Sequence, residues 1–256
     1  MSEAFTRAAA TLSSAVEKRL FSEYGAIFLT RATPPPKILF ADSAEVEEFQ
    51  SSLATQSAML GDYLIELQSE AMDALHEAAA ESKSAGGRIT ARADDAGRRS
   101  YEDTVRLWTR NVTRGLDHWQ REGRITSALA DEIAALSPSD QVQRILALED
   151  EEQIYFGTFF DKSILYSVAA PGASQHLSLL AFDVAEFEDD RVEQVMADFG
   201  WHRTVVSDFP HFTYLGRRVE DLPGLKRVSR AYKGRDYFFL VPDMEFHLTG
   251  SALDSV

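Results

Sequence analysis

Residues able to bind a metal ion gather in the second half of the chain. His176 and Asp183 lie seven positions apart, and His211 follows Asp208 by three positions. Zinc in hydrolases is typically held by three protein nitrogen or oxygen ligands, and a water molecule in the fourth position then has a pKa of about 7. We therefore predict that His176, Asp183 and His211 bind Zn²⁺. The remaining carboxylate, Asp208, is then available to carry protons.

The spacing of these residues requires irregular backbone. Side chains alternate between the two faces of a strand, so a pair at an odd separation converges only if one member lies in a loop, bend or bulge. Pro171-Gly172 precedes the first pair and Pro210 interrupts the second, which favours such irregularity. The alternative is a buried helix over Gln175–Phe187, with His176 and Asp183 paired on its outer side.

The elements that position these residues differ between the two halves. Apolar residues at helical spacing, together with helix caps, predict helices in the first half, and β-branched and aromatic runs predict strands in the second. The expected helices cover 1–20, a start at Ser43, Leu60–Ala80, Tyr101–Trp119, Ala128–Leu136, Pro138–Leu148 capped by Ser137, and Glu188–Phe199 ended by Gly200. The expected strands cover Trp201–Val206, Phe212–Leu215 and Tyr237–Val241, while Ala26–Leu29 and Lys37–Phe40 are either strands or docked loops.

This order predicts an α+β fold in which a mostly antiparallel sheet carries the zinc site and is packed with helices. The small residues of Ser82–Gly87 are the expected boundary. Residues 1–87 would form an N-terminal helical region of unknown role, and residues 88–256 a catalytic domain.

Composition excludes several classes of protein. The 256 residues carry a formal net charge of −15, which repels phosphate backbones, so nucleic acid is not expected as a partner. Without cysteine the chain has no thiolate ligands, which leaves histidine and carboxylate for zinc. No run of about 18 apolar residues predicts a membrane span. The first residues lack the apolar core of a secretory signal, which predicts a cytoplasmic protein.

The metal-ligand pattern resembles that of the LAS-type zinc peptidases, specifically the D-alanyl-D-alanine carboxypeptidase and dipeptidase family. The family signature runs Ser-x-His, six residues, Asp, and later Glu or Asp, two residues, His. Ser174–Asp183 and Asp208–His211 match these two parts, and Ala96–Tyr101 is similar to the family's Ser-Gly-Tyr-Arg-Ser segment. The likeness covers roughly Arg88 to Leu215. Leu179 replaces the glycine of the signature, and Pro210 replaces the tryptophan that often precedes the last histidine.

The resemblance implies a zinc metallopeptidase in which His176, Asp183 and His211 hold the metal. It implies that Asp208 is the general base and acid, and that Arg99 stabilises the polarised carbonyl of the substrate. The expected reaction is hydrolysis of short peptides that end in D-alanine, of the kind found in peptidoglycan, by a carboxypeptidase or dipeptidase. Family members commonly act on cell-wall peptides, which would place the protein in the cell envelope instead of the cytoplasm.

Each role has an ordinary alternative. Arg99 lies beside Arg98 and near Asp94 and Asp95, so a surface ion-pair cluster is also expected of it. Asp208 would otherwise cap the turn before the last histidine. His202 is a substitute ligand ranked below His211, or a pocket residue.

The alternative for the whole protein is a non-catalytic peptide-binding or regulatory protein on the same scaffold. In that case the replacement of the family's glycine by Leu179 and of its tryptophan by Pro210 would have removed the catalytic activity.

Overall fold

The computed structural model describes residues 3–206 and 208–244, and these divide into two compact units. Unit 1 lies within Met1–Ile38, Glu47–Arg99 and Gln175–Val256. Unit 2 lies within Leu39–Val46 and Ser100–Ser174. The boundary expected after residue 87 therefore falls inside unit 1, and the assignment of separate roles to 1–87 and 88–256 stays a prediction.

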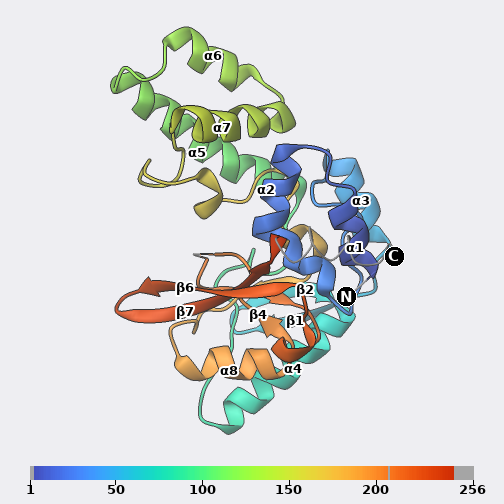
Figure 1. Ribbon diagram of the computed structural model, residues 1–256. Coiled ribbons are helices and arrows are strands. Elements are labelled where there is room, and N and C mark those ends of the chain that lie inside the picture. Colours follow the sequence, from blue (N-terminus) through green and yellow to red (C-terminus); the bar gives the residue numbers. More distant parts are fainter. Residues whose placement is uncertain (1–2, 207, 245–256) are drawn as a thin grey trace, which may run out of the picture. The chain divides into compact units, whose positions relative to one another are not determined.

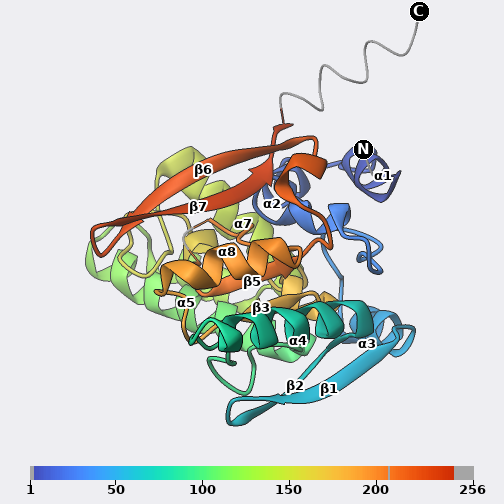
Figure 2. The same cartoon turned by 90° about the horizontal axis from the view of Figure 1, so that it is seen from below.

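Unit 1 is an α+β structure with three small antiparallel sheets (Figures 1 and 2). Its helices are α1 (Glu3–Ala10), α2 (Ala15–Tyr24), α4 (Ser69–Ser84) and α8 (Asp190–Asp198), with 3-10 turns η1 (Gly25–Leu29), η3 (Gln175–Ser178) and η4 (Val219–Asp221). Its strands are β1 (Thr55–Leu60), β2 (Tyr63–Gln68), β3 (Ala181–Asp183), β4 (Trp201–His202), β5 (His211–Tyr214), β6 (Leu225–Tyr232) and β7 (Arg235–Pro242). Helix α3 (Ser43–Ser51) runs across the division between the units.

The central sheet has the strand order β3-β5-β4, with both pairs antiparallel. Its register places Asp183 directly opposite His211. Phe182, Trp201 and Phe212 are buried on this sheet, and α4 and α8 pack against each other in the same unit (Figure 2). The expectation of an α+β fold with mostly antiparallel pairing in the second half is confirmed.

Unit 2 is helical, with α5 (Tyr101–Arg121), α6 (Ser127–Ala135), α7 (Pro138–Glu152) and the 3-10 turn η2 (Ile164–Tyr166). Ser100 and Asp103 form a capping box that begins α5. The buried stripe of α5 includes Trp108, whose indole N–H donates to the Gln141 side-chain oxygen at 2.8 Å. The predicted helices are confirmed here because caps and periodicity agree, as at Ser137, which caps α7.

Several local predictions were wrong. The helix expected over Leu60–Ala80 begins only at Ser69, because residues 55–68 form the β1–β2 hairpin. Gly61, with φ of 73°, permits the tight turn between Leu60 and Tyr63.

Other differences concern short segments. The opening helix is divided into α1 and α2, with Ser14 capping the second. Residues 26–29 lie in a 3-10 turn, and Lys37–Phe40 form no strand. The strand expected over Trp201–Val206 ends at His202, and β6 was not predicted.

Within residues 3–206 and 208–244, every helix is too short or too polar to traverse a lipid bilayer.

Candidate metal centre

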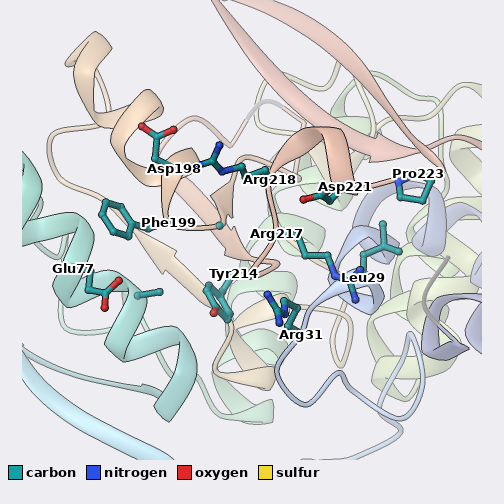
Figure 3. A pocket seen from close by; sticks show the side chains of 13 residues that line it. Leu29, Arg31, Glu77, Asp198, Phe199, Tyr214, Arg217, Arg218, Asp221 and Pro223 are labelled. Carbon is teal, nitrogen blue, oxygen red and sulfur yellow. The ribbon is translucent and has the colours of Figure 1, made fainter.

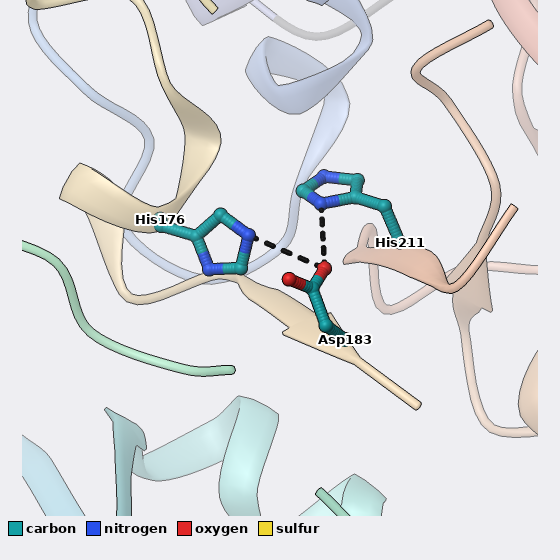
Figure 4. A group of neighbouring side chains, drawn as sticks. All are labelled: His176, Asp183 and His211. Carbon is teal, nitrogen blue, oxygen red and sulfur yellow. Dashed lines mark hydrogen bonds and ion pairs between the residues drawn. The ribbon is translucent and has the colours of Figure 1, made fainter. Parts of the chain in front are cut away.

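His176, Asp183 and His211 converge in unit 1 (Figure 4). One ligand atom from each lies within 4.8 Å of the other two. His176 comes from η3, Asp183 from the end of β3, and His211 from the start of β5. Both histidines are buried, and the Asp183 side chain is 15% exposed. The convergence that the metal prediction requires is therefore present.

Irregular backbone produces this convergence, as the odd spacings demanded. After η3, Leu179 adopts a left-handed conformation with φ of 55°, and the chain then enters β3. The buried helix considered over Gln175–Phe187 is therefore wrong. Before β5, the His211 N–H donates to the Asp208 carbonyl at 3.2 Å, which closes a turn around Pro210.

The hydrogen bond of His176 determines which ring nitrogen carries the proton. Its Nδ1 lies 2.7 Å from the Gly97 carbonyl oxygen, which can only accept, so Nδ1–H donates. Burial, with a smaller effect of the Arg99 charge, lowers the pKa of His176 from 6.5 to about 4. The imidazole is therefore neutral at pH 7, and Nε2 carries a lone pair. That Nε2 is buried, has no hydrogen-bond partner among the described residues, and lies 3.4 Å from Asp183 Oδ1.

The side chain of Gln175 determines which ring nitrogen of His211 carries the proton. The Gln175 amide nitrogen donates to the Tyr24 carbonyl at 3.0 Å, which fixes the amide so that its oxygen points the other way. That oxygen lies 2.9 Å from His211 Nε2 and must accept its proton. His211 Nδ1 therefore carries the lone pair when the ring is neutral, and it faces Asp183 Oδ1 at 3.1 Å.

His176 Nε2 and His211 Nδ1 thus face the same Asp183 oxygen, at 3.4 and 3.1 Å. Burial alone would raise the pKa of Asp183, but the two histidines hold it well below its usual range, so the carboxylate is ionised. Neutral His176 presents its Nε2 lone pair to this oxygen, and a cation between them would be favoured in the buried setting. Two nitrogens with one carboxylate oxygen suit a first-row transition metal.

Each candidate ligand also has an outer partner that orients it, which is typical of metal sites. Gly97 holds His176, Gln175 holds His211, and Arg99 Nη2 donates to Asp183 Oδ2 at 2.9 Å. Sequence reasoning missed Gly97 and Gln175 as supporting residues. The sequence could have indicated them only through their neighbours, because Gln175 directly precedes His176 and Gly97 lies in Ala96–Tyr101, the segment that contains Arg99.

Arg99 is placed beside the candidate ligands, and its side chain is 16% exposed. Besides Asp183 it contacts Asp95, through the backbone carbonyl at 3.1 Å and the carboxylate at 3.4 Å. The ion-pair cluster considered from the sequence is thus present in part, while Arg98 pairs instead with Glu66. Arg99 orients Asp183, and its action on a substrate carbonyl stays a prediction.

Asp208 lies outside the three-residue cluster, at the turn before β5. Packing of the protein around this carboxyl raises the pKa of Asp208, and the negative charge of Asp183 adds to this effect. His202 is not in the cluster either. Its Nε2 lies 2.8 Å from the Arg217 carbonyl oxygen, and burial lowers its pKa.

Comparison with known proteins gives no match to this chain among family models, curated proteins or solved structures. The likeness to zinc peptidases therefore rests on the motif residues alone.

Replacing Gly97 by alanine should weaken metal binding without touching a ligand. A Cβ at this position would lie 2.6 Å from the Ile65 Cγ2 atom and 2.9 Å from the Glu66 carbonyl oxygen, so the backbone must shift. The shift withdraws the carbonyl that holds His176. Loss of an outer partner typically weakens metal binding about 10- to 100-fold, and overpacking lowers the free energy of unfolding by about 1–3 kcal/mol. Competition with a chelating indicator measures the first effect, and denaturant unfolding measures the second. Wild-type metal affinity in this variant would contradict the supporting role of Gly97.

The low pKa of His176 should make the stability of the metal-free protein depend on pH. The unfolded chain binds a proton at this histidine below pH 6.5, whereas the folded protein does so only below about pH 4. The free energy of unfolding should therefore rise by about 3 kcal/mol between these pH values. The raised pKa of Asp208 acts in the opposite direction, because its contribution is lost as pH rises through the folded pKa.

The free energy of unfolding is measured against pH for the wild type and for His176→Gln, each with denaturant in the presence of a chelator. The difference between the two profiles gives the contribution of this histidine. Parallel pH profiles for the two proteins would show that the imidazole is not held neutral.

Proposed function

We propose that His176, Asp183 and His211 hold one divalent metal ion, zinc in the first instance, and that the chain is a metallopeptidase. The single observation that carries the proposal is the convergence of His176 Nε2 and His211 Nδ1 on one Asp183 carboxylate oxygen. Neutral imidazoles and a carboxylate are ligands that zinc accepts, and the chain has no cysteine to offer. When bound to three protein ligands, zinc supplies a Lewis acid and lowers the pKa of bound water to about 7.

The residues around the ligands have separate tasks in this proposal. Gly97 and Gln175 keep each histidine in the tautomer that leaves a lone pair available, and Arg99 keeps Asp183 oriented. Burial of both histidines excludes bulk water from the side of the ligands that faces the core. Asp208 carries a proton to and from the reacting groups at its carboxyl oxygen. Its raised pKa supports this task, because a general base works best when its pKa lies closer to the working pH.

The proposed substrate is a short peptide with a C-terminal D-alanine. The motif likeness of Ser174–Asp183 and Asp208–His211 supports this choice. The choice of substrate therefore rests on the sequence pattern, whereas the proposed metal centre rests on the geometry of the three side chains.

Release of D-alanine from short peptides tests this function directly. The purified protein is incubated with dipeptides and tripeptides that end in D-alanine or in L-alanine, with and without a chelator. D-alanine release that stops with the chelator and returns with added Zn²⁺ supports the peptidase. Recovery only with Fe²⁺ or Mn²⁺ would keep a metal hydrolase but overturn the choice of zinc.

A second function, peptide binding without turnover, is favoured by one contact. The Arg99 guanidinium is already engaged by Asp183 and Asp95, so its assignment to a substrate carbonyl requires that contact to open. Stoichiometric zinc with no hydrolysis across the same peptides would select this second function.

A further inference from the structure

A cavity of about 800 Å³ lies in unit 1, and none of the residues of the metal centre lines it (Figure 3). Its walls come from η1, α4, the end of α8, and the segment that follows β5. Tyr214 lines it, and this residue lies three positions after His211 on the same strand. Side chains alternate along a strand, so the cavity and the metal centre are on opposite faces of β5.

Three arginines with no carboxylate partner line this cavity: Arg31, Arg217 and Arg218. In the part of the chain that the structure describes, none of them forms an ion pair or a side-chain hydrogen bond. A guanidinium is a planar donor suited to bidentate binding of a carboxylate or phosphate. Arg31 and Arg218 are exposed and Arg217 is half-buried, so a ligand in the cavity has access to the two exposed arginines.

The Nε–H donor of Arg217 is the second observation that points to a ligand. This atom is buried and has no acceptor among residues 3–206 and 208–244. A buried donor without an acceptor destabilises the folded protein. Turning the guanidinium toward the cavity would let an oxygen of a bound molecule accept from this donor, and Figure 3 shows the Arg217 side chain in the cavity wall beside Arg31.

The charges of the cavity favour an amphoteric ligand over a polyanion. Three carboxylates also line it, namely Glu77, Asp198 and Asp221, so the formal charges of its side chains balance. Figure 3 shows Tyr214 between Glu77 on α4 and Arg31. Burial raises the pKa of the Tyr214 hydroxyl, as do the charges of Glu70 and, more weakly, Glu77, while Arg31 opposes the shift. The hydroxyl therefore keeps its proton at pH 7, between a negative and a positive wall.

We propose that this cavity binds a small zwitterion, a free amino acid or a short peptide. Arg31 and Arg217 hold its carboxylate, and Glu77 faces its ammonium group. Phe199, which is half-buried, supplies apolar surface for its side chain. This site does not rest on the proposed peptidase activity, because none of its residues belongs to the metal centre.

Calorimetric titration of the full chain in the presence of a chelator tests the site separately from the metal centre. The probes are alanine, dialanine, N-acetylalanine and inorganic phosphate. We expect saturable binding of alanine or dialanine. The one that binds more tightly shows whether the ligand is a free amino acid or a short peptide. Arg217→Ala and Arg31→Ala should each weaken this binding at least about tenfold. Glu77→Gln should weaken alanine or dialanine but not N-acetylalanine, which has no ammonium group.

Arg110→Ala is the matched control, because Arg110 is an exposed arginine on α5 in unit 2. Circular dichroism verifies that each variant is folded. The proposal is overturned if neither alanine nor dialanine binds, or if Arg217→Ala and Arg31→Ala bind them as wild type does. Phosphate binding that exceeds zwitterion binding and increases in Glu77→Gln would replace the proposal with a simple anion site.

Discussion

Replacing His176 by alanine should reduce the metal content of the purified protein from about one ion per chain to almost none. The side chain supplies one of three candidate ligands, and its Nε2 lone pair has no other partner among the described residues. Loss of an outer partner alone costs about 10- to 100-fold in metal affinity, so loss of a ligand should cost more than about 100-fold. Elemental analysis after gel filtration measures the stoichiometry, and titration with Zn²⁺ measures the affinity.

The matched control is His76→Ala, which removes an exposed histidine on α4 that lies outside the cluster. It should retain metal at the wild-type stoichiometry. His211→Ala should behave as His176→Ala does. Full metal content in either ligand variant, with the protein folded, would end the assignment of this centre.

Asp208→Asn should retain the metal and lower turnover of D-alanyl peptides by about 10²- to 10⁴-fold, the usual contribution of a positioned general base. The amide keeps the size of the carboxyl but cannot accept the proton. In the wild type, kcat/KM should fall as pH drops through the raised pKa of Asp208, because the carboxylate becomes protonated. In the variant this acidic limb should be absent from the residual activity.

Asp131→Asn serves as the control for this substitution, since Asp131 is an exposed aspartate on α6. Turnover and pH profile should match those of the wild type. Asp208 is not the proton carrier if Asp208→Asn hydrolyses the peptides at the normal rate with an unchanged pH profile.

Local signals made part of this fold predictable. Helices α5, α7 and α8 have side-chain caps, and Gly200, with φ of 79°, follows the end of α8. Such signals act within one turn of chain, so the sequence exposes them. The β1–β2 hairpin was missed because Leu64 and Leu67 also fit helical spacing, and the pairing that selects the strand is not local.

The sequence predicted the candidate ligands of the site, but it did not predict the residues and backbone conformation that orient them. The sequence suggested His176, Asp183 and His211, and the structure brings them together, while metal binding itself stays a prediction. The left-handed conformation of Leu179 could not be expected, because a leucine rarely adopts it. Its side chain is buried, and packing there must offset the strain. The bond from Gln175 to Tyr24 joins residues 151 positions apart, and no local pattern reveals it.

That bond has a consequence for how the protein matures. Because the Tyr24 carbonyl fixes the Gln175 amide, the end of α2 determines which nitrogen of His211 would bind the proposed metal. During synthesis α2 leaves the ribosome long before His211 does, and it must be docked before that histidine is ready. Loading of the proposed metal would then be a late event in biogenesis. We expect a chain without the first two helices to keep all three candidate ligands but to bind metal poorly.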